Sequence, residues 1–262
     1  TLVVPNVTLN NNGTVQWGYI GYLFVRATLQ KKNGEEWTDL ATRTTTNGWN
    51  QSISFDALTT PGTYRAVADA LQGTDVVMRG ISDELLIEET FTVTFNAQTL
   101  FANPEAMTAP KKSKITLPTV PDQYKYQSSG NTHIFYWSTD AEGNTPWRFD
   151  EDSLMQDITL YAQWIECPAL NPVWDGKICR WTMTETLKAA SKDRMVTVYT
   201  ENDNYIFGSG GDAIEDHIDF DSSNSLFFPG RKYSFSAGVR DDYYNEVAFK
   251  SELMTVEGEA TI

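Results

Sequence analysis

The sequence is short of the residues that build most catalytic and metal centres. It has two histidines, His133 and His217, and two cysteines, Cys167 and Cys179, in 262 residues. Two histidines so far apart in the chain make a poor metal site or catalytic triad. Two cysteines without a CxxC spacing do not form a disulfide scaffold. We therefore expect no enzyme and no cofactor, and two unpaired thiols are favoured over a bridge between them.

Long apolar runs and positive charge are also scarce. No hydrophobic stretch reaches the length of a membrane-spanning helix. The chain has 20 Lys+Arg against 35 Asp+Glu, a formal net charge of −15 at pH 7. Such a surface repels phosphate backbones, so we expect neither a nucleic-acid partner nor membrane insertion of this fragment. The chain starts at Thr1 without the apolar core of a signal peptide, which favours a mature fragment of a longer protein.

Strand and turn signals dominate the first section, residues 1–89. Asn-Gly and Pro-Gly pairs, as at Asn33-Gly34 and Pro61-Gly62, separate short stretches rich in β-branched and aromatic residues. This spacing predicts an antiparallel β-sandwich. The predicted strands are Thr14–Ile20, Leu23–Gln30, Ser52–Leu58 and Thr63–Leu71.

The last section, residues 166–262, repeats this plan. Ile178–Met183 matches the first strand, and Arg194–Asn202 matches the second. An Ile-x-Phe-Asp segment then leads in both sections to a Pro-Gly turn and a tyrosine-bearing strand. Agreement in order at this many points indicates an internal repeat.

Both sections resemble fibronectin type III domains, particularly those of modular bacterial surface proteins. The resemblance is carried by an early tryptophan (Trp17, Trp181), by the Pro-Gly turns before Tyr64 and Tyr233, and by closing strands that begin with Ser and an acidic residue. It implies that the Trp and Tyr side chains pack between two sheets.

The middle section, residues 90–165, ends on the alternating stretch DITLYAQW, Asp157–Trp164. Ile158, Leu160, Ala162 and Trp164 fall on one face of the predicted strand. A slip of one residue would expose this whole apolar set, so we expect a fixed register. Such a small module buries a thin core and needs bulky aromatic residues to fill it.

With VTFN near Val93 and FYWSTDAEGNTPWRFD from Phe135, this strand resembles the Listeria–Bacteroides repeat, the internalin B-repeat type. The resemblance implies a small β-grasp-like module. Where the family carries a glycine pair after the opening strand, this chain has Ala97-Gln98-Thr99. We therefore expect a remodelled opening turn.

Two further segments suggest chemistry only superficially. Phe207–Asp212 is glycine-rich but lacks the Gly-x-Ser-x-Gly spacing of a nucleophile turn, so we expect a hairpin loop. A group of acidic residues is the second segment, and its carboxylate oxygens could hold Ca²⁺. No EF-hand spacing is present, so we favour the interpretation that these are solvated charges of a loop. The acidic residues concerned are Asp212, Glu215, Asp216, Asp219 and Asp221, with Asp241-Asp242 in a second loop.

Aromatic residues in polar stretches are the most credible ligand contacts. Trp37 and Trp49 lie in turn-rich segments, and Tyr243-Tyr244 follow two aspartates in a predicted loop. Exposed rings stack on sugars or anchor protein interfaces. The alternative, which we favour, is that Trp37 covers a sheet edge and that the two tyrosines pack under their loop.

The sequence thus predicts a mainly β protein: two Ig/fibronectin III-like sandwiches, residues 1–89 and 166–262, flanking a β-grasp-like module, residues 90–165. We expect each module to be sealed by its own aromatics. The resemblances imply a secreted or cell-wall-attached protein of a Gram-positive or gut bacterium. We expect a monomeric, non-catalytic region that acts as adhesion or spacer modules and contacts a host or matrix protein or glycan. The alternative is a carbohydrate-binding accessory region of a larger extracellular enzyme.

Overall fold

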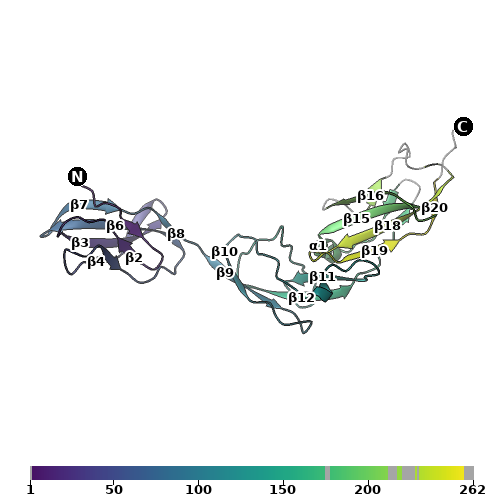
Figure 1. Cartoon of the computed structure of the whole chain (residues 1–262), viewed down its shortest axis with the longest axis horizontal. Coiled ribbons are helices and arrows are strands. Elements are labelled where there is room, and N and C mark those ends of the chain that lie inside the picture. The colour runs from purple at the N-terminus through teal and green to yellow at the C-terminus, as the bar shows by residue number, and fades with distance from the viewer. Residues whose placement is uncertain (1, 175–177, 212–216, 220–227, 229, 257–262) are drawn as a thin grey trace. The chain divides into compact units, whose positions relative to one another are not determined.

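The structure, a computed structural model, describes residues 2–174, 178–211, 217–219, 228 and 230–256. Nearly all of the regular secondary structure in the described chain is β-strand (Figure 1). The contacts divide the chain into two compact units, residues 1–90 and 91–262.

The first unit is a sandwich of two sheets. One sheet has the order β1-β2-β5, and the other β4-β3-β6-β7, with β8 paired to β6. The first sheet contains β1 (Thr8–Leu9), β2 (Thr14–Gln16) and β5 (Ser52–Ser54), and the second contains β3 (Phe24–Asn33), β4 (Glu36–Thr44), β6 (Gly62–Gln72), β7 (Asp75–Ile81) and β8 (Leu85–Ile87).

Alternation along these strands explains the core between the sheets. Val25, Ala27 and Leu29 of β3 and Tyr64, Ala66 and Ala68 of β6 point inward and are buried. Trp17, the early tryptophan of the resemblance, joins them. The hydroxyl of Tyr64 donates a hydrogen bond to the Thr60 carbonyl at 2.7 Å. A tyrosine bonded to backbone a few residues upstream is typical of Ig-like sandwiches.

The last part of the second unit repeats this topology. Its sheets have the orders β13-β14-β17 and β16-β15-β18-β19, with β20 paired to β18. The strands are β13 (Val173–Trp174), β14 (Ile178–Arg180), β15 (Asp193–Thr200), β16 (Tyr205–Gly211), β17 (His217–Asp219), β18 (Lys232–Arg240), β19 (Glu246–Lys250) and β20 (Met254–Thr255), and a short helix α1 (Glu185–Ala190) joins β14 to β15.

Two outcomes follow for the predictions in this part. The prediction of a mainly β fold with two Ig/fibronectin III-like sandwiches is confirmed. The prediction of a hairpin loop at Phe207–Gly211 is wrong, because these residues form β16 and pair with β15 from Val198↔Phe207 to Arg194↔Gly211. Strand β16 lies at the edge of its sheet, where glycines are tolerated that would weaken a central strand.

The first part of the second unit, the middle module of the chain, holds a four-stranded sheet in the order β10-β9-β12-β11. Strand β12 pairs in parallel with β9 and antiparallel with β11. One face is closed by loop residues and by the 3-10 helix Asp122–Tyr124. The strands are β9 (Thr90–Asn96), β10 (Met107–Pro110), β11 (His133–Ser138) and β12 (Ile158–Glu166).

The register of β12 agrees with the alternation in its sequence. Leu160 and Ala162 are buried in the module's core, and Ile158 and Trp164 pack against it. The other face of the same sheet is also covered. Ile134 and Tyr136 of β11 are buried in the core of the last sandwich, and Ile165 packs against it.

The expectation that every module is sealed by its own aromatics is therefore wrong for the second unit. Its two parts share side chains in both directions: Tyr243 from the last sandwich lies in the middle module's core, while Ile134 and Tyr136 enter the sandwich's core. Strand β11 is buried on both faces as a result. The physical reason is that β11 is an edge strand, which proteins commonly cover.

Candidate functional site: a closed end and an open end

The segment Asp241–Asn245, which connects β18 to β19, inserts into the middle module. The Tyr243 hydroxyl accepts a hydrogen bond from the Trp137 indole at 2.8 Å and donates one to the Pro118 carbonyl at 2.8 Å. Only 6% of Tyr243 is exposed. The prediction of Tyr243 as a ligand contact is corrected: its ring packs edge-on against Phe135 inside the protein.

Asp241 caps the free edge of β11. Its carboxylate accepts the Phe135 backbone N–H at 2.5 Å and the N–H groups of Tyr243 and Asn245 at 2.8 and 3.1 Å. The Asn245 side chain donates to the same carboxylate at 2.9 Å. Burial raises the pKa of Asp241 to about 6, against the lowering effect of these hydrogen bonds.

Asn245 links the segment Asp241–Asn245 to the loop before β11 by hydrogen bonds. Its amide donates to the Tyr124 carbonyl at 2.7 Å and accepts from the Gln127 N–H at 3.1 Å. Backbone bonds add Tyr126 N–H to the Tyr243 carbonyl at 3.0 Å and Glu246 N–H to the Gln127 carbonyl at 2.7 Å. We call the contacts of Asp241–Asn245 with the middle module the junction.

Tyr244, the next predicted ligand contact, lies at the rim of the junction. Its ring is partly exposed and stacks on Tyr126, with centroids 5.6 Å apart and planes within 2°. Lys192 and Arg240 lie over the same ring at 5.1 and 5.5 Å. These partners hold the ring in place, so Tyr244 is a rim contact of the junction as well as a surface residue.

Trp37 belongs to a charged sheet face of the first unit. It lies in β4, a strand that the sequence does not predict. The Arg65 guanidinium sits 4.1 Å from its ring centroid, and Lys32 sits 5.6 Å away. Cations covering the ring leave it poorly placed to stack on a ligand.

The same sheet face carries a buried carboxylate between two arginines. Arg79 binds Asp69 through two nitrogens at 2.6 and 3.0 Å, and Arg26 binds it at 2.9 Å. Although burial opposes it, the hydrogen bonds from Arg79 and Arg26 hold the pKa of Asp69 below its usual value. A paired carboxylate of this kind supports the sheet and is a poor proton donor.

Trp49 is the most exposed of the four predicted residues, at 67%. Its ring meets the ring of Tyr22 edge-on, with centroids 4.3 Å apart and planes at 77°. Tyr22 and nearby Tyr19 are 64% and 60% exposed. The sequence reasoning missed both tyrosines, although the stretch Tyr19-Ile20-Gly21-Tyr22 combines aromatic residues with a turn glycine.

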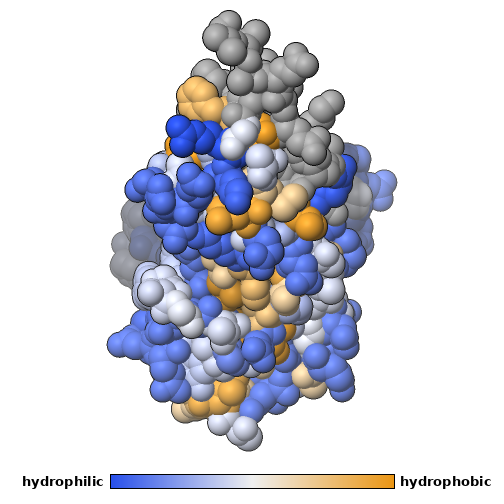
Figure 2. Space-filling view, turned by 90° about the vertical axis from the view of Figure 1, so that its right-hand side faces the viewer, coloured by the Kyte–Doolittle hydropathy of each residue, from blue (hydrophilic) through white to orange (hydrophobic). Residues whose placement is uncertain are grey.

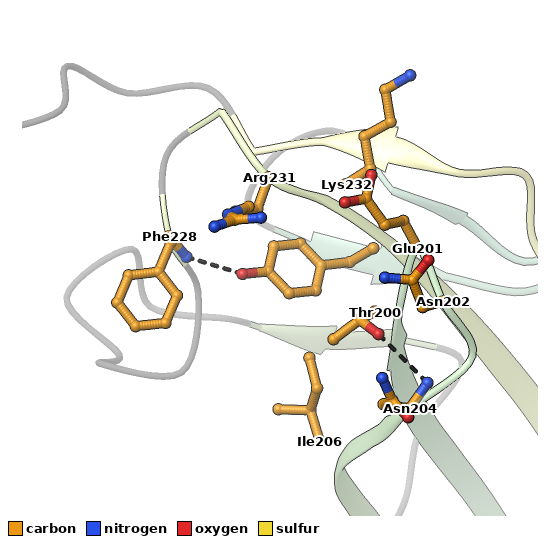
Figure 3. Close-up of a pocket in the computed structure, with 9 residues that line it drawn as sticks. Thr200, Glu201, Asn202, Asn204, Ile206, Phe228, Arg231 and Lys232 are labelled. Atoms are coloured by element: carbon orange, nitrogen blue, oxygen red, sulfur yellow. Dashed lines mark hydrogen bonds between the residues drawn. The ribbon is translucent and has the colours of Figure 1, made fainter.

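A hollow of 540 Å³ opens at one end of the last sandwich (Figure 3). Tyr233, whose hydroxyl accepts the Phe228 N–H at 3.0 Å, lines this hollow together with Ile206 and Arg231. In the first unit, Leu58 packs on the core, and the segment that ends at Thr60 lines a smaller hollow beside Tyr64. Residues 220–227, which join β17 to β18, are outside the described part of the chain.

Among the described residues, no group of three or more His, Cys, Asp or Glu side chains could hold a metal ion. The acidic set at 212–221 lies largely outside these residues, because only Asp219 has a described backbone. Cys167 is buried, and burial raises the pKa of its thiol to about 11. The side chain of Cys179 is outside the description, so its redox state stays a prediction.

Two observations concern apolar residues in the described part of the chain. None of the described helices has the length and apolar character that crossing a membrane requires. The face in Figure 2 is mostly hydrophilic, with hydrophobic residues in small groups between hydrophilic ones. Small apolar groups of this size are ordinary on protein surfaces.

The chain is similar to solved structures of fibronectin type III proteins. A two-domain segment of chicken tenascin has a TM-score of 0.24 and 8% identity, covering 96% of this chain and 98% of that chain. The FN1–FN3 domains of chicken CNTN1 have a TM-score of 0.23 and 10% identity, covering 95% of this chain and 66% of that chain. No family model and no curated protein matches the chain. The two sandwiches share one strand order. In each, a tyrosine early in β6 or β18, Tyr64 or Tyr233, hydrogen-bonds through its hydroxyl to backbone a few residues upstream, an arrangement called the tyrosine corner.

Proposed function

We propose that this chain is a non-catalytic modular region of a bacterial extracellular or cell-surface protein, acting as adhesion or spacer and presentation modules. Three modules in series, residues 1–89, 90–165 and 166–262, form it. Fibronectin-like sandwiches commonly serve as such modules, and the paired carboxylate and buried thiol described above offer no reactive group.

The junction is the observation that carries this proposal. A spacer must hold its modules in a fixed orientation, and a free linker does not. Here the link is reinforced by a buried tyrosine, a buried aspartate and a buried asparagine, all hydrogen-bonded to the neighbouring module. Buried polar groups that are fully paired specify one geometry. The middle and last modules therefore act as one stiff segment.

We assign the middle module to the Listeria–Bacteroides repeat type. Support comes from the parallel pairing of β12 with β9 and from the turn that follows β9. Gln98 and Thr99 there have φ of 49° and 72°, in the left-handed region that favours glycine. The chain thus keeps, with other residues, a backbone conformation suited to the glycine pair of that family.

The setting and partners follow from the same proposal. We place the protein outside the cell, secreted or attached to the wall, with a host or matrix protein or a glycan as its partner and no nucleic acid. We propose no cofactor, Ca²⁺ at the 212–221 acidic set being the less favoured alternative. The parent reading frame tests the setting: an export signal and a wall-sorting motif support it, and a cytoplasmic protein without either contradicts it.

Residual dipolar couplings of the full chain test the stiff segment. We expect the amides of β12 and of β18 to report one shared alignment tensor. Tyr243→Phe, which removes only the bridging hydroxyl, and Tyr243→Ala should progressively separate the two tensors. Tyr205→Phe, at an exposed tyrosine of the last sandwich, is the matched control. Independent tensors in the unsubstituted chain would refute the spacer function.

A carbohydrate-binding accessory region is the second candidate. The exposed ring pair of Tyr22 and Trp49 favours it. This candidate requires a ligand site, and the first unit is where the described residues offer one.

A further inference from the structure

We propose that the end of the first unit formed by residues 17–23 and 45–51 is a binding site for a neutral oligosaccharide, with Tyr22 and Trp49 as the stacking rings. The inference deepens the adhesion part of the proposed function. It does not depend on the junction, so either can fail alone.

The strand register brings these two segments to one end of the sandwich. Residues 17–23 lead into β3, whose first residues Phe24 and Arg26 pair with Leu71 at the end of β6 and Thr44 at the end of β4. The segment 45–51 leaves β4 at that same end. Loops held by a rigid sandwich are where binding residues commonly lie.

This end is also the one away from the strand with which the unit closes. Strand β8 pairs with Gly62–Tyr64 at the start of β6, whereas the two segments lie beside the end of β6. The eleven residues of β6 separate the two positions by roughly 30 Å at the usual strand rise. The site and the closing strand β8 therefore lie at opposite ends of β6.

Local structure fixes how Trp49 is presented. The Asn47 side chain accepts the backbone N–H groups of Trp49 and Asn50 at 3.0 and 3.2 Å. A Cβ on Gly48 would lie 2.1 Å from the Tyr22 carbonyl oxygen, so glycine permits the close approach of the two segments. The buried Thr45 hydroxyl accepts the Val25 N–H at 3.0 Å and anchors the start of the segment.

The chemistry of the two segments selects the ligand. Neither 17–23 nor 45–51 contains a charged residue, although charged residues make up 21% of the chain. What they expose are aromatic rings and the amides of Asn47, Asn50 and Gln51. Rings that cover apolar C–H faces, beside neutral groups that hydrogen-bond hydroxyls, suit an uncharged sugar. An anionic glycan or an acidic peptide would find no cation in either segment.

Titration of the full chain with neutral oligosaccharides tests the site. The probes are a neutral glycan array, then cellohexaose and maltoheptaose followed by amide shifts and tryptophan fluorescence, with a heparin hexasaccharide as the anionic comparison. We expect saturable binding of a neutral glycan, with shifts at 17–23 and 45–51. Trp49→Ala and Tyr22→Ala should each weaken it by about tenfold or more.

The controls separate this result from misfolding and from other partners. Tyr205→Ala, at an equally exposed tyrosine of the second unit, should leave the affinity unchanged. Amide spectra of Trp49→Ala should keep the β3 and β6 shifts of the folded unit. Failure of every neutral glycan to bind, binding that survives Trp49→Ala, or a Trp49-dependent partner that is an unglycosylated protein would overturn the proposal.

Discussion

The two sandwiches use the same end of the same topology in opposite ways. In the last sandwich, the connection from β18 to β19 carries Tyr243 and Asp241 into the middle module. In the first, the connection from β6 to β7 is a short turn around Gly73, and the neighbouring segments expose Tyr22 and Trp49. In the last sandwich this end is closed by the middle module, and we call it the closed end; the exposed end of the first unit we call the open end. Aromatic residues at this end are therefore buried structural contacts in one sandwich and exposed in the other.

Truncation at the closed end should have the largest effect. Tyr243→Ala removes a buried ring and leaves the Trp137 indole without its acceptor. We expect the free energy of unfolding of the second unit to fall by about 3–5 kcal/mol. Urea unfolding followed by side-chain signals of each unit measures this, and the first unit should keep its midpoint. A loss below about 1 kcal/mol would show that the closed end is loosely packed.

The stability of the second unit should depend on pH through Asp241, which lies at the closed end. Burial raises its folded-state pKa to about 6, above the ordinary value of 3.8. The folded state therefore binds the proton more tightly, and this contribution is present below about pH 4 and lost as pH rises through 6. The difference amounts to at most about 3 kcal/mol by linkage. Asp241→Asn should remove it from the pH profile of the second unit, whereas Asp122→Asn, at an exposed carboxyl, should not. Identical profiles for wild type and Asp241→Asn would contradict this account.

The tyrosine corner is present in both sandwiches, at the start of β6 and of β18, whether the opposite end is open or closed. Tyr64→Phe removes the hydrogen bond to the Thr60 carbonyl inside the first unit. We expect its unfolding free energy to fall by about 1 kcal/mol. Thermal or urea unfolding of the full chain, read at the first unit, measures this loss, and Tyr19→Phe at an exposed ring serves as the control. An unchanged midpoint would show that the hydrogen bond of Tyr64 to Thr60 does not stabilise the first unit.

Truncation at the open end should have the smallest effect on stability. Tyr22→Ala removes a mostly exposed ring whose main contact is Trp49. Surface substitutions of this kind change the unfolding free energy by about 0.5 kcal/mol, and the lost ring pair adds about as much. Urea unfolding read at the first unit gives the value. A loss comparable to that of Tyr243→Ala would mean that the open end is part of the core.

Alternation in the sequence predicted the strands whose two faces differ. The register of β12 and the inward residues of β3 and β6 are examples. Strand β4 escaped prediction because, apart from half-buried Trp37, its residues are all exposed. A polar edge strand carries no period-2 signal.

Of the candidate functional residues, some could be predicted from the sequence and others could not. Trp49 and its exposure could be anticipated from a polar, turn-rich segment. The junction could not, because it joins Phe135 to Asp241 and Pro118 to Tyr243 across more than one hundred residues. Local periodicity says nothing about contacts of such separation. The favoured burial of Tyr243 was an inference from residue type alone, and the partner that buries it came only from the fold.

Hydrogen exchange of the Phe135 amide in the full chain tests the closed end most directly. This N–H points out of the free edge of β11, and Asp241 is its acceptor. We predict that it exchanges as slowly as the central amides of β18, and that Asp241→Ala accelerates it while the amides between β11 and β12 stay protected. Exchange of Phe135 as fast as the amides of Tyr19 and Tyr22 would contradict a closed end.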